Sequence, residues 1–260
     1  MATQIRFFGI AAFEITTSQG KVILIDPFLD ENPASPVRAS DLKQVDLILA
    51  THLAYDHLGD TAAIAQRFSC PVVCGPEVKA FLVQQGVDPG QIRTVPWGGQ
   101  VNPDGIRVRG VECHHTSFRQ APDGQYLNGQ PLGFILYADP EVRIYHSGDT
   151  AIFSDLKLIG ELYRPTIGLM CACELERDYL EKLGLKDHYG NEMSGDEGAM
   201  AAAWLGVEVA ILCHYLKAGE QEDIRKFFGY FESRRLEEKA LVRPLALQPG
   251  ATYVYDGRVV

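Results

Sequence analysis

The sequence predicts a mixed α/β fold in which two β-sheets lie face to face with helices on their outer sides, a four-layer αββα sandwich. β-rich segments open the chain and recur after residue 100, and each group is followed by alternating strands and helices. This order favours two similar halves over one parallel sheet. A chain of 260 residues also commonly folds as one unit, so we expect a single domain over residues 1–260.

Strands are predicted from β-rich or apolar runs, and helices from their periodicity and end signals. The predicted strands are residues 4–10, 11–17, 21–26, 45–50, 106–115, 131–138, 142–148, 166–172 and 207–213, with two more around Gly250. The predicted helices are residues 60–68, 76–86, 154–163, 198–206 and 221–236. Pro76 and Gly86 mark the two ends of the second helix, and Ser194 with Glu197 has capping-box spacing before the fourth.

The composition favours a globular protein that acts on small molecules. Charged residues make up 22% and hydrophobic residues 46%, and no apolar run approaches the roughly 20 residues that span a bilayer. The net charge of -10 disfavours a nucleic-acid polymer as partner, because such surfaces concentrate Lys and Arg. The first residues lack a signal-peptide pattern, so we expect a cytoplasmic protein with no membrane partner. Several of the six cysteines lie in apolar runs, which predicts buried, reduced thiols.

Side chains that bind metals gather where predicted strands end. The segment THLAYDHLGD, residues 51–60, directly follows a buried strand. The candidate metal ligands are His52, Asp56, His57, His115, Asp149 and His214. Imidazoles and carboxylates hold divalent cations while leaving a position for water, and α/β proteins place ligands beyond the carboxyl ends of strands. One histidine at a strand end is more often structural, whereas the whole set predicts a metal site.

With these segments in order, the chain resembles the metallo-β-lactamase superfamily, whose signature is THxHxDH followed by separate histidine, aspartate and histidine ligands. Within it, the sequence is most similar to the L-ascorbate-6-phosphate lactonase-like branch of metal-dependent hydrolases. The likeness is carried by LIDPFLDENP (24–33), SGDTAIFSDLKLIGELYRPTIGLM (147–170) and the HY pair at 214–215. The resemblance implies an αββα sandwich of the metallo-β-lactamase type.

The resemblance also distributes the ligands over two divalent ions, Zn²⁺ or Mn²⁺. By this resemblance, His52 and His115 would bind the first ion, and Asp56, His57 and His214 would bind the second. Asp149 would bridge the two ions. Asp56 and Asp149 are then the catalytic carboxylates, since Asp149 would fix a bridging hydroxide and Asp56 could shuttle a proton. We prefer His115 to His114, which we expect on the opposite face of the same strand.

One position departs from the signature, because Ala54 stands where the second histidine of the motif belongs. We therefore expect weak occupancy of the first site, with one ion in this chain instead of two. Three explanations are an engineered substitution that silences the enzyme, a natural one-metal enzyme, and a natural non-catalytic protein. The first fits an otherwise intact ligand set best. If restoring the histidine adds no metal, another residue fills the gap or the site was always mononuclear.

Two further departures bear on the substrate. Residues 9–11 read Gly-Ile-Ala where the branch carries Gly-His-Ser, so a polar group near the site is absent. After Cys171 the chain inserts CELERDYLEKLGLKDHYGNEM (173–193), which we expect to shape the substrate pocket. Candidates for substrate binding are His188, Lys217 and Arg119, although a residue of each kind is more often an ordinary surface or structural residue.

These observations predict a metal-dependent hydrolase that opens a small lactone or a related cyclic ester or amide by attack of a metal-bound hydroxide. Ala54 would leave this chain weakened or inactive. One alternative is a phosphodiesterase acting on a small or cyclic nucleotide, because a two-metal centre suits phosphoryl transfer equally well. The other is a non-catalytic relative that binds a small molecule. In each case the partner is a small molecule, and the resemblance is compatible with a homo-oligomer.

Overall fold

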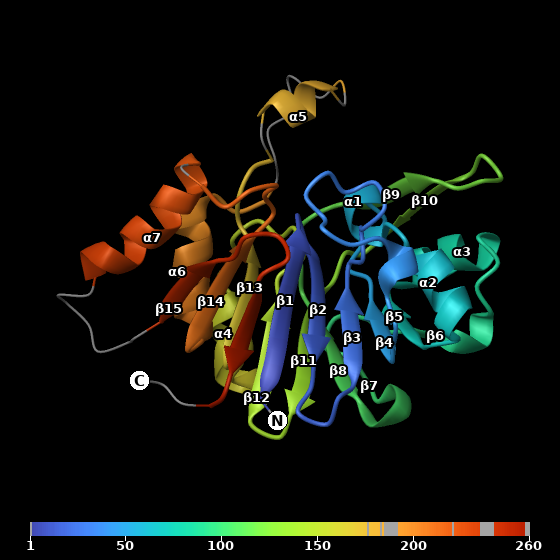
Figure 1. Ribbon diagram of the computed structural model, residues 1–260, viewed down its shortest axis with the longest axis horizontal. Coiled ribbons are helices and arrows are strands. Elements are labelled where there is room, and N and C mark those ends of the chain that lie inside the picture. The colour runs from blue at the N-terminus through green and yellow to red at the C-terminus, as the bar shows by residue number, and fades with distance from the viewer. Residues whose placement is uncertain are drawn as a thin grey trace.

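The computed structural model describes residues 2–175, 177–182, 184, 192–219, 221–234 and 242–257. Two seven-stranded sheets lie against each other, and helices cover their outer sides, which confirms the predicted αββα sandwich (Figure 1). Among the described helices, none has the length and apolar character that crossing a membrane requires.

The first sheet is built from the N-terminal part of the chain and the last strand. Its strand order is β16-β1-β2-β3-β4-β5-β6, antiparallel from β16 to β3 and parallel from β3 to β6. The strands are β1 (Thr3–Gly9), β2 (Ala12–Thr16), β3 (Val22–Ile25), β4 (Leu47–Leu49), β5 (Val72–Cys74), β6 (Ile92–Thr94) and β16 (Thr252–Tyr255). β4 and β5 are buried along their whole length, as expected for parallel strands covered on both faces.

The second sheet has the same mixed character. Its order is β15-β14-β13-β12-β11-β8-β7, antiparallel from β7 to β12 and parallel from β12 to β15. The strands are β7 (Gln100–Val101), β8 (Arg107–Val111), β11 (Gly133–Asp139), β12 (Val142–His146), β13 (Ile167–Cys171), β14 (Val209–Cys213) and β15 (Arg243–Ala246). A separate hairpin pairs β9 (Ser117–Gln120) with β10 (Tyr126–Gly129).

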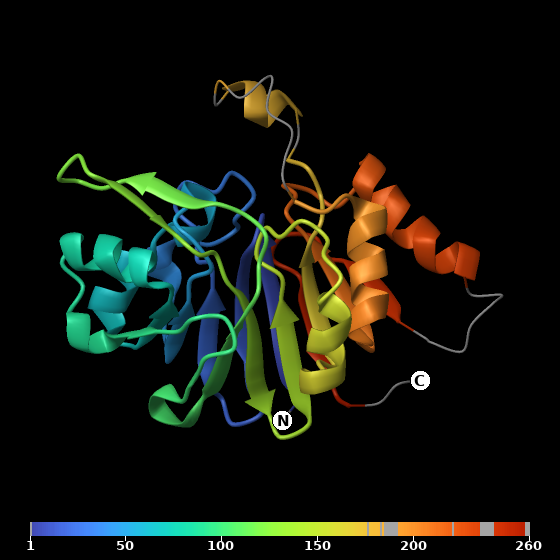
Figure 2. The same ribbon diagram turned by 180° about the vertical axis from the view of Figure 1, so that it is seen from behind.

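The helices fall into two outer layers. They are α1 (Tyr55–Leu58), α2 (Thr61–Phe68), α3 (Pro76–Gln84), α4 (Leu156–Tyr163), α5 (Arg177–Lys182), α6 (Gly195–Leu205) and α7 (Glu222–Arg234). α2 and α3 share an apolar cluster with the outer face of the first sheet, and α6 packs on β13 and β14 of the second. Figures 1 and 2 show α2 and α3 on one flank and α6 and α7 on the other.

Alternation along the strands divides the apolar residues between these layers. Phe7 and Phe13 face the core between the two sheets, whereas their neighbours Phe8 and Ala12 belong to the cluster beneath α2 and α3. Successive side chains of a strand point to opposite faces, so one strand contributes to two cores. The first sheet is therefore held from both sides.

The carboxyl ends of the parallel strands in both sheets meet at one end of the sandwich. β3, β4, β12 and β14 all lead into loops that carry polar residues at this end. In both views α1 and α5 stand at or beyond this same end (Figures 1 and 2). The fold thus concentrates polar loops at one edge, where α/β proteins place their ligands.

Most predicted elements are confirmed, and the differences concern short pieces. The predicted strand over residues 106–115 is wrong at its end, because β8 stops at Val111 and both His114 and His115 lie in the following loop. β5, β6 and the β9–β10 hairpin were not predicted. Each of these strands has only three or four residues, which is too short for a clear period-two signal.

Candidate metal centre

Asp149 lies at the middle of a cluster of imidazoles. Its Oδ2 is 2.8 Å from Nε2 of His57, 3.5 Å from Nε2 of His214 and 3.8 Å from Nε2 of His52. All four side chains are buried. They come from loops after β4, β12 and β14 and from α1, so the centre joins the two sheets.

The single turn of α1 explains the tight spacing of the motif. Residues 51–54 form a loop, and α1 begins directly after Ala54 and carries Asp56 and His57. Asp56 Oδ2 lies 3.9 Å from Nε2 of His214, and both side chains are buried. The loop and turn therefore wrap around one point, as the spacing predicts.

The two adjacent histidines after β8 have different surroundings. The His115 ring lies 5.1 Å from the His52 ring at 80°, which brings His115 to the cluster. His114 instead stacks on Phe153 with ring centroids 4.4 Å apart, and its Nε2 is 2.7 Å from a carboxylate oxygen of Glu112. The structure thus places His115 at the centre and gives His114 contacts of its own.

A buried network behind the cluster sets the orientation of two imidazoles. The Thr51 hydroxyl donates to Asp26 at 2.7 Å, so its oxygen is available to accept from Nδ1 of His52 at 2.9 Å. Asp26 Oδ2 lies 2.7 Å from Nδ1 of His57, and an ionised carboxylate can only accept, so this Nδ1 donates. Both rings therefore turn their Nε2 towards Asp149.

Hydrogen bonds to backbone carbonyls fix the orientation of His214 in a similar way. Its Nδ1 donates to the Cys173 carbonyl at 2.8 Å, which leaves Nε2 as the acceptor facing the cluster. Its own N–H donates to the Ile10 carbonyl at 2.7 Å, and both residues have positive φ, +75° and +55°. Strained backbone of this kind concentrates at functional sites. Ile10 therefore helps to hold the His214 backbone through its carbonyl oxygen, although its side chain offers no polar group.

A glycine turn delivers Asp149. Gly148 has φ +58°, and a Cβ there would lie 2.8 Å from the Leu132 carbonyl oxygen. Its N–H donates to Nδ1 of buried His146 at 3.1 Å. The turn after β12 is consequently tight, and glycine is the residue that permits it.

Burial and the neighbouring charges both shift the pKa values of the residues in the cluster. Burial lowers the pKa of His52 well below its ordinary value, and the neighbouring His57 adds to this. Burial also disfavours charge on His57, yet the carboxylates of Asp149 and Asp26 outweigh it and hold its pKa well above the ordinary value. His57 and His214 in turn hold the pKa of Asp149 well below its usual range despite burial. A cation entering the centre has to displace a proton.

The donor set fits a divalent cation. Several buried polar atoms at the centre have no hydrogen-bond partner among the described residues: Nε2 of His52 and His214, Nδ1 of His115, and Oδ1 of Asp149. Leaving such atoms buried and unpaired is costly, whereas a shared cation satisfies all of them. Two triads have ligand atoms within 4.8 Å of one another: His52, His57 and Asp149; and Asp56, His57 and His214.

Two contributors were not predicted. Asp26 lies inside the segment that carried the family likeness, yet its role in orienting His57 follows only from the fold. Glu192 has a carboxylate oxygen within 4.8 Å of ligand atoms of His115 and Asp149. Its place in the segment inserted after Cys171 was the available signal.

The predicted substrate-binding residues have separate positions. Arg119 is half-buried, with its guanidinium 4.9 Å from the Phe81 ring centroid and 3.5 Å from the Leu53 carbonyl. Lys217 is exposed in the loop three residues after His214. His188 lies outside the described residues. All six cysteines are buried thiols, and the pair Cys171 and Cys213 approaches to 3.3 Å between sulfurs.

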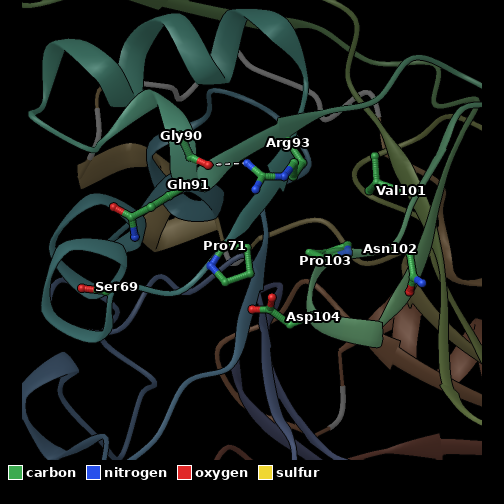
Figure 3. A pocket seen from close by; sticks show the side chains of 9 residues that line it. All are labelled: Ser69, Pro71, Gly90, Gln91, Arg93, Val101, Asn102, Pro103 and Asp104. Carbon is green, nitrogen blue, oxygen red and sulfur yellow. Dashed lines mark hydrogen bonds between the residues drawn. The ribbon is translucent and has the colours of Figure 1, made fainter.

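A hollow in the surface lies away from this centre. It has a volume of about 460 Å³ and includes Ser69 and Pro71, which precede β5, and Arg93 on β6. Figure 3 shows Arg93 hydrogen bonded to the Gly90 carbonyl at its rim. Since the metal-binding candidates follow the carboxyl ends of the parallel strands, this hollow is at the opposite end of β5.

The αββα sandwich places an imidazole–carboxylate centre at its strand ends, an arrangement that suits metal-dependent hydrolysis. The family model described as the β-lactamase superfamily domain matches residues 21–215. The chain belongs to this superfamily and is a metal-dependent hydrolase.

Relatives and solved structures agree with this assignment. A UPF0173 metal-dependent hydrolase of Thermococcus onnurineus is 41% identical over 231 residues, covering 87% of this chain and 92% of the relative. One of Archaeoglobus fulgidus is 34% identical over 259 residues, covering 97% and 99%. The structure of Igni18, a metallo hydrolase from Ignicoccus hospitalis, superposes with TM-score 0.75 at 26% identity, covering 99% of this chain and 100% of that one. The resemblance to the superfamily is confirmed, and the lactonase-like branch stays a prediction.

Proposed function

We propose that the centre is built for two divalent ions, Zn²⁺ or Mn²⁺, and that the chain hydrolyses a small lactone or a related cyclic ester or amide, with Ala54 weakening the first metal site and the activity. The observation that carries the proposal is the convergence of three Nε2 atoms on Asp149, each with its Nδ1 engaged by the surrounding structure. The likeness of residues 24–33 and 147–170 to the lactonase-like branch supports the substrate class.

Asp149 is the residue that we propose would contribute a ligand to both ions. Its Oδ2 approaches imidazoles assigned to both sites, His52 of the first and His57 with His214 of the second. When bound, such ions would lower the pKa of a coordinated water to about 7 and polarise the substrate carbonyl. Binding of the ions is assisted by the low pKa of Asp149, which keeps this carboxylate ionised.

Asp56 is the proposed proton shuttle. It lies at the start of α1, 3.9 Å from His214, and its side chain keeps a small exposed fraction of 10% while His57 beside it has none. A carboxylate at the border between the centre and solvent can take a proton from the attacking water and pass it to the leaving oxygen. Lys217 and Arg119 remain proposed substrate-binding residues, with Lys217 the more accessible of the two.

The test is a turnover assay with protein stripped by a chelator and reloaded with Zn²⁺ or Mn²⁺. A panel of lactones and cyclic amides is compared with phosphodiesters, including cyclic nucleotides. We expect lactone hydrolysis that disappears in His115→Ala and persists in His114→Ala, because only His115 reaches the cluster. Turnover confined to phosphodiesters would overturn the substrate class. No turnover by the chain or by Ala54→His would instead indicate a non-catalytic relative.

A further inference from the structure

The first metal site lacks the ligand that a histidine at residue 54 would supply. His52 and His115 approach it with their rings 5.1 Å apart, and Asp149 reaches it from β12. Ala54 precedes α1 and ends in a methyl group, which cannot coordinate an ion. A four-coordinate site therefore needs one more protein group or solvent at this position.

A second carboxylate is present at this site. An oxygen of Glu192 and ligand atoms of His115 and Asp149 all lie within 4.8 Å of one another. Nδ1 of His115 and Oδ1 of Asp149 are buried and have no hydrogen-bond partner in the described part of the chain. Leaving polar atoms buried and unpaired is costly, and a cation held between these three side chains would satisfy them.

The backbone that carries Glu192 is anchored directly after it. Met193 is buried with 1% exposure, and Ser194 caps α6, with its N–H donating to Glu197 at 2.9 Å. The next N–H, of Gly195, donates to Asp223 on α7 at 3.0 Å. Glu192 is thus two residues from a fixed helix start, and a ligand held in this way is positioned before the ion arrives.

We propose that Glu192 replaces the imidazole missing at residue 54, so that His52, His115, Asp149 and Glu192 together hold the first ion. This inference rests on the proposed metal-dependent function and adds a ligand to it. Ala54 alone would leave the first site with three protein ligands. Glu192 would supply the fourth ligand.

The exchange also alters the chemistry of the site. An oxygen donor takes the place of a nitrogen donor, giving two imidazoles and two carboxylates. Carboxylates suit Mn²⁺ better than imidazoles do, and imidazoles suit Zn²⁺. The first site of this chain should therefore accept Mn²⁺ more readily than a site with a histidine at residue 54.

Metal content per chain tests the proposal. The protein is stripped by a chelator, reloaded with Mn²⁺ or Zn²⁺, freed of excess ion by gel filtration and measured by elemental analysis. We expect two ions per chain for the parent and one for Glu192→Gln, with the first-site affinity at least about 10-fold weaker. Glu181→Gln is the matched control, because Glu181 is an exposed residue of α5 in the same inserted segment, and it should keep two ions.

A rescue variant keeps the test independent of folding. Glu192→Gln combined with Ala54→His should recover two ions and shift the preference of the first site from Mn²⁺ towards Zn²⁺. Two ions in Glu192→Gln alone, or one ion in both the parent and Glu192→Gln, would overturn the role of Glu192. The second of these results would leave the hydrolytic proposal standing on the other site. A parent that binds no ion after reloading would overturn both proposals.

Discussion

Asp26→Asn should weaken metal binding without disturbing the fold. Asp26 is fully buried, with 0% exposure, and its carboxylate accepts from the Thr51 N–H at 2.8 Å, from the Thr51 hydroxyl at 2.7 Å and from Nδ1 of His57 at 2.7 Å. Its φ of +46° is left-handed, a region that asparagine tolerates as well as aspartate. The backbone of the variant is therefore unstrained.

The side-chain amide of the asparagine would change the hydrogen bond to His57. An asparagine oxygen can still accept from Thr51, but its NH₂ group then faces Nδ1 of His57, which has to become an acceptor. The ring proton moves to Nε2 and points at Asp149, where the cation would bind. Loss of an outer-shell partner of this kind costs about 10–100-fold in metal affinity, or roughly 1.4–2.8 kcal/mol.

The assay is a competition titration against a chromogenic chelator, with the thermal unfolding midpoint of the metal-free protein measured in parallel. Asp139→Asn is the matched control, because Asp139 also accepts three hydrogen bonds, from the Thr3 hydroxyl and from the N–H and hydroxyl of Ser18. We expect Asp139→Asn to leave the metal Kd unchanged. An unchanged Kd in Asp26→Asn, or equal losses in both variants, would refute the orienting role of Asp26.

Three further predictions concern the turn, the protons and the thiols. Gly148→Ala should lower the unfolding midpoint and the metal affinity together, because its Cβ would lie 2.8 Å from the Leu132 carbonyl oxygen; an unaltered variant would contradict the tight turn. The carboxylate of Asp149 helps to raise the pKa of His57 above 6.5, so this proton stabilises the metal-free fold at low pH and is lost as pH rises through the raised value. Metal affinity should consequently increase with pH over that window, with proton release in calorimetry; a flat profile would count against it. Burial raises the pKa of the Cys70 thiol to about 12, so the native protein at pH 8 should react with a thiol reagent only after denaturant is added, and rapid native labelling would disprove this.

The layers of the fold were predictable because its apolar runs are long and ordered. Strands β4, β13 and β14 appear in the sequence as apolar segments, and the helix start at Pro76 and the N-cap at Ser194 carry their own signals. Short strands such as β5 and β6 owe their state to pairing with neighbours, which a local pattern does not contain. The single-domain assignment stays a prediction.

The centre was predictable where its residues follow a motif. The histidines and aspartates of the motif and of the separated segments meet in space, and the choice of His115 over His114 agrees with their contacts. The expectation that the two histidines lie on opposite faces of one strand was wrong, because both residues lie in a loop. Asp26 and Glu192 escaped prediction since their roles depend on contacts between distant segments.

The location of bound metal tests the central claim most directly. Crystals of the chain loaded with Zn²⁺ or Mn²⁺ would be measured with X-rays at the absorption edge of the ion, so that anomalous peaks mark its position. The account predicts one peak among Asp56, His57, Asp149 and His214, and a second beside His115. Peaks elsewhere, for example between the sulfurs of Cys171 and Cys213, with none at Asp149, would contradict it.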